Sequence, residues 1–253
     1  ALDALTRDTA VVSVMWANNE TGVVQPLGPV VERAHAVGVP VHTDAVQAAG
    51  HVPVDFRAVG VDLLSISGHK VGAPVGIGAL IARRDTPLEP LSHGGGQERG
   101  VRSGTANVPG AAALAAALAV AVDGLAAEAE RQLALRDGIM AALESLDGAH
   151  PTGTSLPPGR RHPGIAHVVL DGVDADSLLF ALDRAGIAAS AGSACRAGVH
   201  EPSHVALAMG WDPEHARGTL RCSVGWDTTA ADVAAFAAAV GDAVGRARRA
   251  HRA

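Results

Sequence analysis

The feature that most constrains the fold is the alternation of short apolar runs with a helical segment near the start of the chain. Apolar runs cover residues 11–16, 39–44, 61–67 and 77–82, and residues 29–37 carry apolar side chains at helical spacing. Short apolar runs bounded by polar or glycine-rich turns are typical of buried strands. Strands separated by helices predict an α/β fold with a mostly parallel sheet and flanking helices.

Polar residues follow the predicted strands. Asn19 lies in the loop after the first strand, Asp44 ends the second, and Gln47 stands three residues later at the start of an expected helix. The third strand ends in the sequence Ser67-Gly68-His69-Lys70. In open parallel sheets, ligands bind beyond the carboxyl ends of the strands. The topology therefore predicts a site formed by the Asn19 loop, Asp44 and Lys70.

The rest of the chain indicates a second, smaller domain. An alanine-rich helical stretch over residues 108–146 is typical of a connector, and the Pro/Gly-rich segment 151–164 is typical of a boundary or an exposed loop. The later predicted elements are a strand at 165–170, a helix at 175–185, a strand at 219–224 and a helix from residue 230 onward. We therefore expect residues 1–125 to form part of a large α/β domain and residues 126–253 to form a small α+β domain.

One residue type is almost absent from the sequence. Of the 20 basic residues, 19 are arginine and one, Lys70, is lysine. A guanidinium stays protonated and is no nucleophile, whereas a lysine amine can lose its proton and condense with a carbonyl. Because arginine serves wherever positive charge suffices, Lys70 indicates imine chemistry. Ser67 and His69 add two donors suited to a phosphate immediately before it.

Composition excludes several classes of function. Lys+Arg 20 against Asp+Glu 26 gives a net charge of −6, so the chain has no overall basic field to attract nucleic acid. The longest apolar stretch, around residues 111–122, is too short to span a bilayer, and the sequence opens without a signal segment. We therefore expect a cytoplasmic protein that contacts neither nucleic acid nor a membrane.

The two cysteines predict different roles. Cys195 and Cys222 are 27 positions apart and neither belongs to a CxxC pair, which argues against a disulfide framework or a metal site. Cys195 lies among small residues at 191–198, which suits a nucleophile that must move between a substrate and an acceptor. The alternative is a buried structural cysteine. Cys222 lies in the alternating run 220–224, which predicts a strand and a core position.

Five segments resemble the cysteine desulfurases of the class V aminotransferase fold, in the same order and at the same spacing. They are Ala17–Gly22, His42–Gln47, Ser67–Lys70, Gly94–Thr105 and Ser190–Cys195. The resemblance covers essentially the whole chain. It implies a large domain that binds pyridoxal 5′-phosphate (PLP), a small C-terminal domain that carries the catalytic cysteine, and a homodimer with shared sites.

The resemblance also implies a role for each matching residue. Cys195, Lys70 and His69 would be the catalytic residues. Asn19 and Arg221 would bind the substrate, and Arg221 would bind the substrate's carboxylate. For the cofactor, Asn19 would contact it, Asp44 would bind the pyridine nitrogen, Gln47 the ring oxygen, Ser67 and His69 the phosphate, Lys70 would form the imine, and Thr105 would reach the phosphate in the partner subunit.

The implied reaction removes sulfur from L-cysteine, giving L-alanine and a persulfide on Cys195 for an acceptor such as an iron-sulfur scaffold or a tRNA-thiolating enzyme. No resident metal is expected, although a transient iron-sulfur contact at Cys195 stays open. The chain is also expected to lack the N-terminal third of the family. Two alternatives stay open: another class V PLP enzyme, such as an aminotransferase acting on a small amino acid, and a truncated, inactive remnant.

Overall fold

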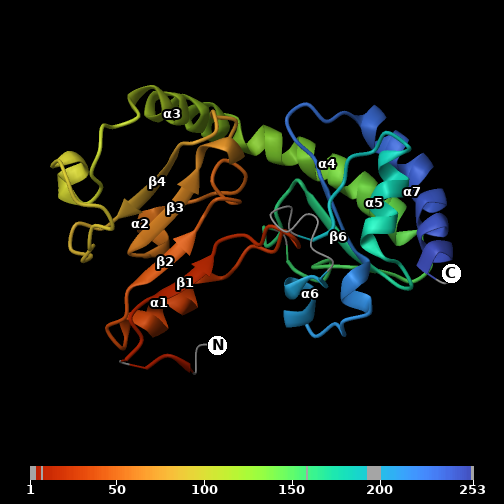
Figure 1. The fold of residues 1–253 in the computed structure, drawn as a ribbon, viewed down its shortest axis with the longest axis horizontal. Helices are drawn as coiled ribbons and strands as arrows, with labels where there is room; N and C mark the ends of the chain where they lie inside the picture. Colours follow the sequence, from red (N-terminus) through yellow and green to blue (C-terminus); the bar gives the residue numbers. More distant parts are fainter. Residues whose placement is uncertain (1–3, 7, 158, 193–200, 252–253) are drawn as a thin grey trace. The chain divides into compact units, whose positions relative to one another are not determined.

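The structure is a computed structural model that describes residues 4–6, 8–157, 159–192 and 201–251. The chain divides into two compact units, which are described separately below (Figure 1). Unit 1 comprises residues 1–17 and 25–125, and unit 2 comprises residues 18–24 and 126–253. The short segment 18–24 therefore belongs to unit 2 although unit 1 contains the residues on either side of it.

Unit 1 is built on a four-stranded sheet. Its strands are β1 (Val12–Met15), β2 (Val41–Asp44), β3 (Leu63–Ser67) and β4 (Gly78–Ala82), hydrogen-bonded in that order. The first three strands are parallel, which confirms the predicted α/β class, whereas β4 is antiparallel to β3. β4 turns back because only residues 68–77 separate it from β3, and a parallel crossover needs roughly a dozen residues or more.

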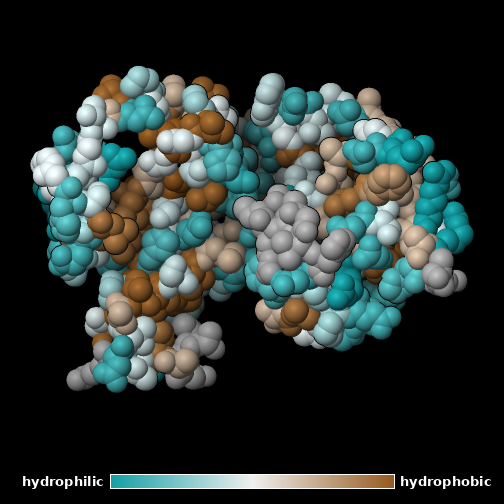
Figure 2. All heavy atoms as spheres, in the orientation of Figure 1, coloured by the Kyte–Doolittle hydropathy of each residue, from teal (hydrophilic) through white to brown (hydrophobic). Residues whose placement is uncertain are grey.

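The sheet of unit 1 has two different faces. Helix α1 (Leu27–His35) buries Leu27, Val31 and Ala34 and contacts β2. Burial alternates along β2, since Val41 and Thr43 are buried while Asp44 is exposed. The other helices that the structure describes in unit 1 are α2 (Phe56–Val59), α3 (Val108–Asp123) and the 3₁₀ turns η2 (Gly68–Lys70) and η3 (Gln97–Gly100). Figure 2 shows hydrophobic atoms in the region of strands β1 to β4.

Unit 2 is an α+β arrangement around a three-stranded antiparallel sheet. The strand order is β5 (Ala149–Pro151), β6 (Ile165–Leu170) and β7 (Thr219–Ser223). Its helices are α4 (Leu125–Glu144), α5 (Ala175–Asp183), α6 (His204–Ala208), the 3₁₀ turn η5 (His215–Gly218) and α7 (Ala230–His251). Asp174 directly precedes helix α5, and its side chain accepts from the Ser177 amide at 3.0 Å and so caps the first turn.

The core of unit 2 lies where α4, α5 and α7 meet the sheet. Every residue of β6 is buried, and α5 contacts α7. The largest fully buried side chains of this core include Leu143, Leu170, Leu178, Leu182 and Leu220. An antiparallel sheet often has only one covered face. Because β6 is buried on both faces, this sheet lies inside unit 2.

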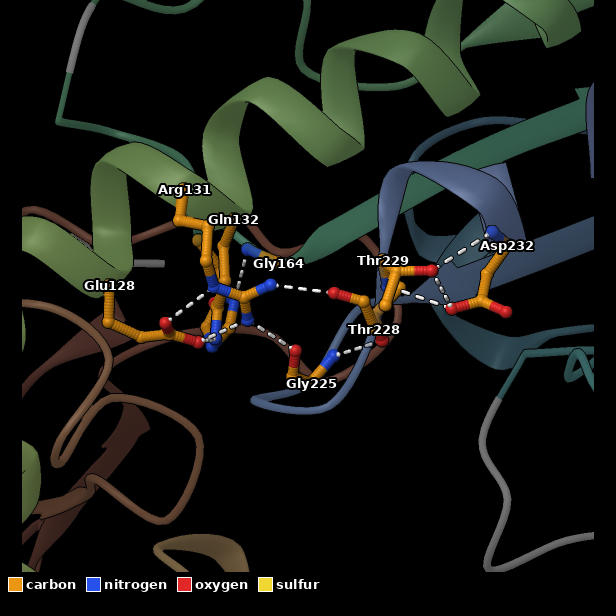
Figure 3. Close-up of polar contacts among 9 residues, drawn as sticks. Glu128, Arg131, Gln132, Gly164, Gly225, Thr228, Thr229 and Asp232 are labelled. Carbon is orange, nitrogen blue, oxygen red and sulfur yellow. Dashed lines mark hydrogen bonds and ion pairs between the residues drawn. The ribbon is translucent and has the colours of Figure 1, made fainter. Parts of the chain in front are cut away.

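A polar network in unit 2 joins α4 to the segment between β7 and α7 (Figure 3). Arg131 of α4 pairs with Glu128 one turn earlier and donates to the carbonyls of Gly225 and Thr228 at 2.6 and 2.7 Å. Thr229, the residue directly before α7, shares hydrogen bonds with Asp232 in the first turn of that helix. One arginine side chain therefore fixes the loop that leads into α7.

The continuous helix expected over residues 108–146 is two helices. α3 ends at Asp123, Gly124 caps it, and α4 starts at Leu125. Glycine carries no side chain to pack and is a poor helix former, so the helix breaks there. No single helix of the described residues is long and apolar enough to cross a bilayer; α3 and α4 reach that length and composition only as a broken pair.

Candidate active site

The carboxyl end of β2 carries the first group of predicted site residues. Asp44 is the last residue of the strand and is exposed, and one of its oxygens, Oδ1, accepts from the Val46 amide at 2.9 Å. The half-buried Gln47 lies in the turn that follows. The helix expected at Gln47 is wrong: the amides of Ala48 and Ala49 both bond to the Ala45 carbonyl, and Gly50 ends this single turn at φ 76°.

The end of β3 carries the second group. Ser67 ends the strand, and its Oγ lies 2.8 Å from Nδ1 of His69. Lys70 follows in η2 with an exposed side chain, and its carbonyl lies 3.0 Å from Nε2 of His51. Gly68 is required here, because a Cβ at this position would lie 2.6 Å from Cγ2 of Ile77. The tight turn at Gly68 therefore places three of the predicted site residues, Ser67, His69 and Lys70, at the end of the strand.

The register of the sheet brings these groups to one edge of unit 1. Asp44 of β2 is paired with Ser65 of β3, and Ser67 lies two residues further along the same face. On that face His42 lies between two hydroxyls, with Nδ1 at 2.8 Å from Ser13 and Nε2 at 2.8 Å from Ser65. Sequence reasoning missed this chain of hydrogen bonds across three strands; its signal was the spacing of two between His42 and Asp44.

Unit 1 also contains Thr105, which is exposed in the segment before α3. Cys195 lies outside the described residues, as does Ser193 in the same motif. Within residues 4–6, 8–157, 159–192 and 201–251, no group of three His, Cys, Asp or Glu side chains is arranged to hold a metal ion.

Asn19 and Arg221 come together in unit 2. Arg221 lies in β7, and its Nη1 donates to the Asn19 carbonyl at 2.9 Å. The backbone of Arg221 is paired with Ser190, whose amide and carbonyl bond to it at 3.0 and 2.7 Å. The Asn18 side chain holds the turn that carries Asn19, since its Oδ1 accepts from the amides of Glu20 and Thr21. Residues about 200 positions apart are thus joined.

A buried histidine stands opposite Arg221 on the neighbouring strand. His167 of β6 is paired with Arg221 of β7, and its Nδ1 lies 2.9 Å from Oγ1 of Thr152. Burial, followed by the charge of Arg221, lowers the pKa of His167 to about 4. His167 is therefore neutral at pH 7 and adds no positive charge beside the guanidinium. The sequence contained no signal for this pair beyond the positions of the two strands.

The structure places Cys222 in the core of unit 2, as the alternating sequence predicted. Cys222 lies on β7 and is buried, and it belongs to the main hydrophobic cluster. Burial raises the pKa of its thiol to about 12. Because the thiolate is the nucleophilic form, a thiol with so high a pKa is inert near neutral pH.

The chain belongs to the class-V aminotransferase family, which matches residues 1–236. It is 48% identical over 244 residues to an IscS-like cysteine desulfurase of Mycobacterium tuberculosis, and the match covers 96% of this chain and 62% of that protein. The chain therefore spans about three fifths of the length of this relative.

Two solved structures are similar to this chain. A NifS-like protein from Rickettsia africae has a TM-score of 0.86 at 29% identity, covering 96% of this chain and 64% of that one. SspA in complex with cysteine has a TM-score of 0.68 at 31% identity, covering 88% of this chain and 61% of that one. These likenesses confirm the predicted fold of a PLP-dependent transferase.

The donor set of unit 1 fits PLP, the cofactor of this family. A protonated pyridine nitrogen needs a carboxylate, and Asp44 presents one at the end of β2. A phosphate needs hydroxyl and ring N–H donors, and Ser67 and His69 lie within 2.8 Å of each other. An aldehyde needs an amine, and the exposed Lys70 is the single lysine of the sequence. The pyridine nitrogen, the phosphate and the aldehyde of the cofactor thus each have a chemically matched residue.

Proposed function

We propose that this chain is the larger part of a cysteine desulfurase, which removes sulfur from L-cysteine to give L-alanine and a persulfide on Cys195. The observation that carries the proposal is the group of Asp44, Ser67, His69 and Lys70 at one edge of the sheet of unit 1. Relatives with 41–48% identity that are named cysteine desulfurases support it. The alternative of a class V aminotransferase has no such support.

The residues of unit 1 would hold the cofactor. Asp44 would bind the pyridine nitrogen, Gln47 the ring oxygen, and Ser67 and His69 the phosphate, while Lys70 would bind the aldehyde carbon. When bound, PLP supplies an electron sink that lowers the barrier to breaking bonds at the α-carbon of an amino acid. Lys70 then moves a proton at Nζ, because an exposed amine can both accept and donate one.

The residues of unit 2 would bind the substrate. Arg221 offers a planar guanidinium to the carboxylate of L-cysteine, a geometry that favours two parallel hydrogen bonds. The Asn19 carbonyl, at 2.9 Å from Nη1, orients that guanidinium. His167 adds no positive charge beside Arg221 at neutral pH because its pKa is about 4. A cysteine-bound relative, SspA, supports cysteine as the substrate.

Cys195 would accept the sulfur. Its thiolate attacks the substrate sulfur, so that an S–S bond forms and the C–S bond breaks with its electron pair left on carbon. A proton then completes L-alanine, and the persulfide on Cys195 passes its outer sulfur to the thiol of an acceptor, such as an iron-sulfur scaffold or a tRNA-thiolating enzyme. We further propose a cytoplasmic homodimer in which Thr105 reaches the phosphate bound by the partner subunit.

The proposal is tested by incubating the chain with PLP, L-cysteine and a reductant and measuring sulfide and alanine. Equal amounts of the two products are expected. Cys195→Ala should abolish both while leaving the spectral response of bound PLP to L-cysteine, and Cys222→Ala is the matched control at the buried thiol. Pyruvate and ammonia in place of alanine beside the sulfide, or a transaminated cofactor without sulfide, would refute the desulfurase assignment.

A further inference from the structure

A buried carboxylate in unit 2 has no part in the chemistry proposed above. Glu20 follows Asn19 in the turn 18–22, and only 1% of its surface is exposed. An acidic side chain removed from water is costly unless polar groups compensate it. The groups that surround Glu20 therefore indicate its structural role.

The first of these groups is Ser203. Its hydroxyl donates to Oε2 of Glu20 at 2.5 Å and accepts from the Ala206 amide at 3.1 Å, where it caps α6. The backbone amide of Ser203 donates to the Ala216 carbonyl at 3.2 Å. His204 is adjacent, with Nδ1 at 4.0 Å from Oε1 of Glu20. Glu20 is thus joined to the start of α6.

The second group is Gly192. Its φ is +55°, and a Cβ built on it would lie 3.0 Å from the same Oε2 atom and 3.4 Å from the carboxyl carbon. The carboxylate therefore lies close to the backbone of Gly192, where a side chain would be crowded and, at this φ, strained. Two residues earlier, Ser190 exchanges both backbone hydrogen bonds with Arg221.

Gly192 and Ser203 stand on opposite sides of Cys195 in the sequence. We propose that Glu20 is a positioning residue for Cys195: one buried oxygen fixes the chain before and after the nucleophile, and this restraint sets how readily the thiol reacts. Bringing the ends of a ten-residue segment to one point costs conformational entropy, and the buried hydrogen bond and contact of Glu20 offset that cost. The inference rests on the proposed function only for the role of Cys195.

The experiment measures the rate at which iodoacetamide alkylates Cys195 in the 253-residue chain, with Cys222 as an internal reference for opening of the core. Glu20→Ala removes the acceptor, so the ratio of the Cys195 rate to the Cys222 rate should rise at least threefold. Glu20→Gln keeps an amide oxygen that accepts from Ser203, and should stay within twofold of the wild type. Glu130→Ala, at an exposed position on α4, is the matched control and should change nothing.

Tryptic cleavage after Arg196 gives a second reading that does not depend on the thiol. In Glu20→Ala it should accelerate at least threefold, while cleavage after Arg99 in unit 1 stays unchanged. An unchanged Cys195 rate in Glu20→Ala would overturn the inference. So would a parallel rise at Cys195 and Cys222, which would make Glu20 a residue of general stability, or a Glu20→Gln rate equal to that of Glu20→Ala.

Neither measurement uses PLP or L-cysteine. A failure of the proposed desulfurase activity would therefore appear in the sulfide and alanine assay while the alkylation result stands. A failure of the Glu20 inference would leave that assay unaffected.

Discussion

The proposed site residues lie in different places on the two sheets of the molecule. In unit 1 they lie beyond the ends of parallel strands, where Asp44 and Lys70 are exposed. In unit 2, Arg221 lies within an antiparallel strand, opposite the buried His167 and beside the buried Cys222. Groups at strand ends can be changed with little effect on packing, whereas groups inside a strand share the core that stabilises the unit. Chemistry and stability should therefore separate in unit 1 and stay coupled in unit 2.

The largest expected effect tests the strand ends of unit 1. Lys70→Ala and Lys70→Arg should both lose covalent PLP completely, because neither side chain offers a nucleophilic amine. Borohydride reduction followed by peptide mapping measures it, with the wild-type label expected at Lys70. As a control, Lys70→Arg combined with Arg84→Lys restores one lysine at an exposed position and should not restore the label at the wild-type level. Retention of a stable reduced adduct in Lys70→Arg would contradict the assignment.

The second prediction compares the two sheets directly. Leu220→Ala, at a fully buried position of β7, should lower the free energy of unfolding by about 2–5 kcal/mol. Asp44→Asn, at the exposed end of β2, should change it by less than about 0.5 kcal/mol while weakening PLP binding. Urea unfolding followed by circular dichroism measures both. A cost above about 2 kcal/mol for Asp44→Asn would break the distinction between the sheets.

The third prediction uses the pH dependence of unit 2. The pKa of His167 is about 4 in the folded chain against an ordinary value of 6.5, so the unfolded chain binds a proton in this window that the folded chain does not. The stabilising contribution is therefore complete above pH 6.5 and is lost as the pH falls toward 4, by about 3 kcal/mol in all. Urea midpoints at pH 7 and pH 4.5 measure the loss.

His167→Gln should flatten this pH dependence, because glutamine does not titrate. The control is His150→Asn, which removes a partly exposed histidine on β5 that lies 2.9 Å from Asp171. It should keep most of the wild-type slope between pH 7 and pH 4.5. Equal slopes in the wild type and in His167→Gln would show that the buried histidine does not carry the effect.

The smallest expected effect concerns the second thiol of the sequence. Cys222→Ala should leave sulfide production within about twofold of the wild type, since a thiol with a pKa of about 12 supplies almost no thiolate near neutral pH. Its stability cost should be about 1 kcal/mol, because only one buried sulfur atom is removed. A tenfold loss of activity in a variant that melts normally would place Cys222 in the chemistry.

Much of the fold followed from the sequence because apolar periodicity is a local signal. The strand predicted at 39–44, which the structure has at 41–44, the strand at 165–170 and the core position of Cys222 were predicted in this way. The break at Gly124 and the turn at Gln47 were missed, because both depend on a single glycine inside a segment with strong helical composition. The antiparallel β4 could have been predicted from the short connection before it.

The candidate site was predictable where one motif carried the whole group, as in Ser67–Lys70. It was not predictable where distant segments meet. The contacts of Glu20 with Gly192 and Ser203, and the pairing of His167 with Arg221, depend on tertiary structure. The polar turn at 17–22 did contain an isolated acidic residue, which is the one sequence signal that could have drawn attention to Glu20.

The segment 18–24 has a consequence for how the chain folds during synthesis. It leaves the ribosome with unit 1, yet its hydrogen-bond partners include Arg160, His162 and Arg221. The sheet of unit 1 can therefore form early, since domains generally fold in the order in which they emerge. The turn at 18–24 must wait until more than a hundred further residues have been made. Unit 2 is consequently completed late in synthesis. Residues 126–253 expressed alone would lack the segment 18–24, which is part of its fold.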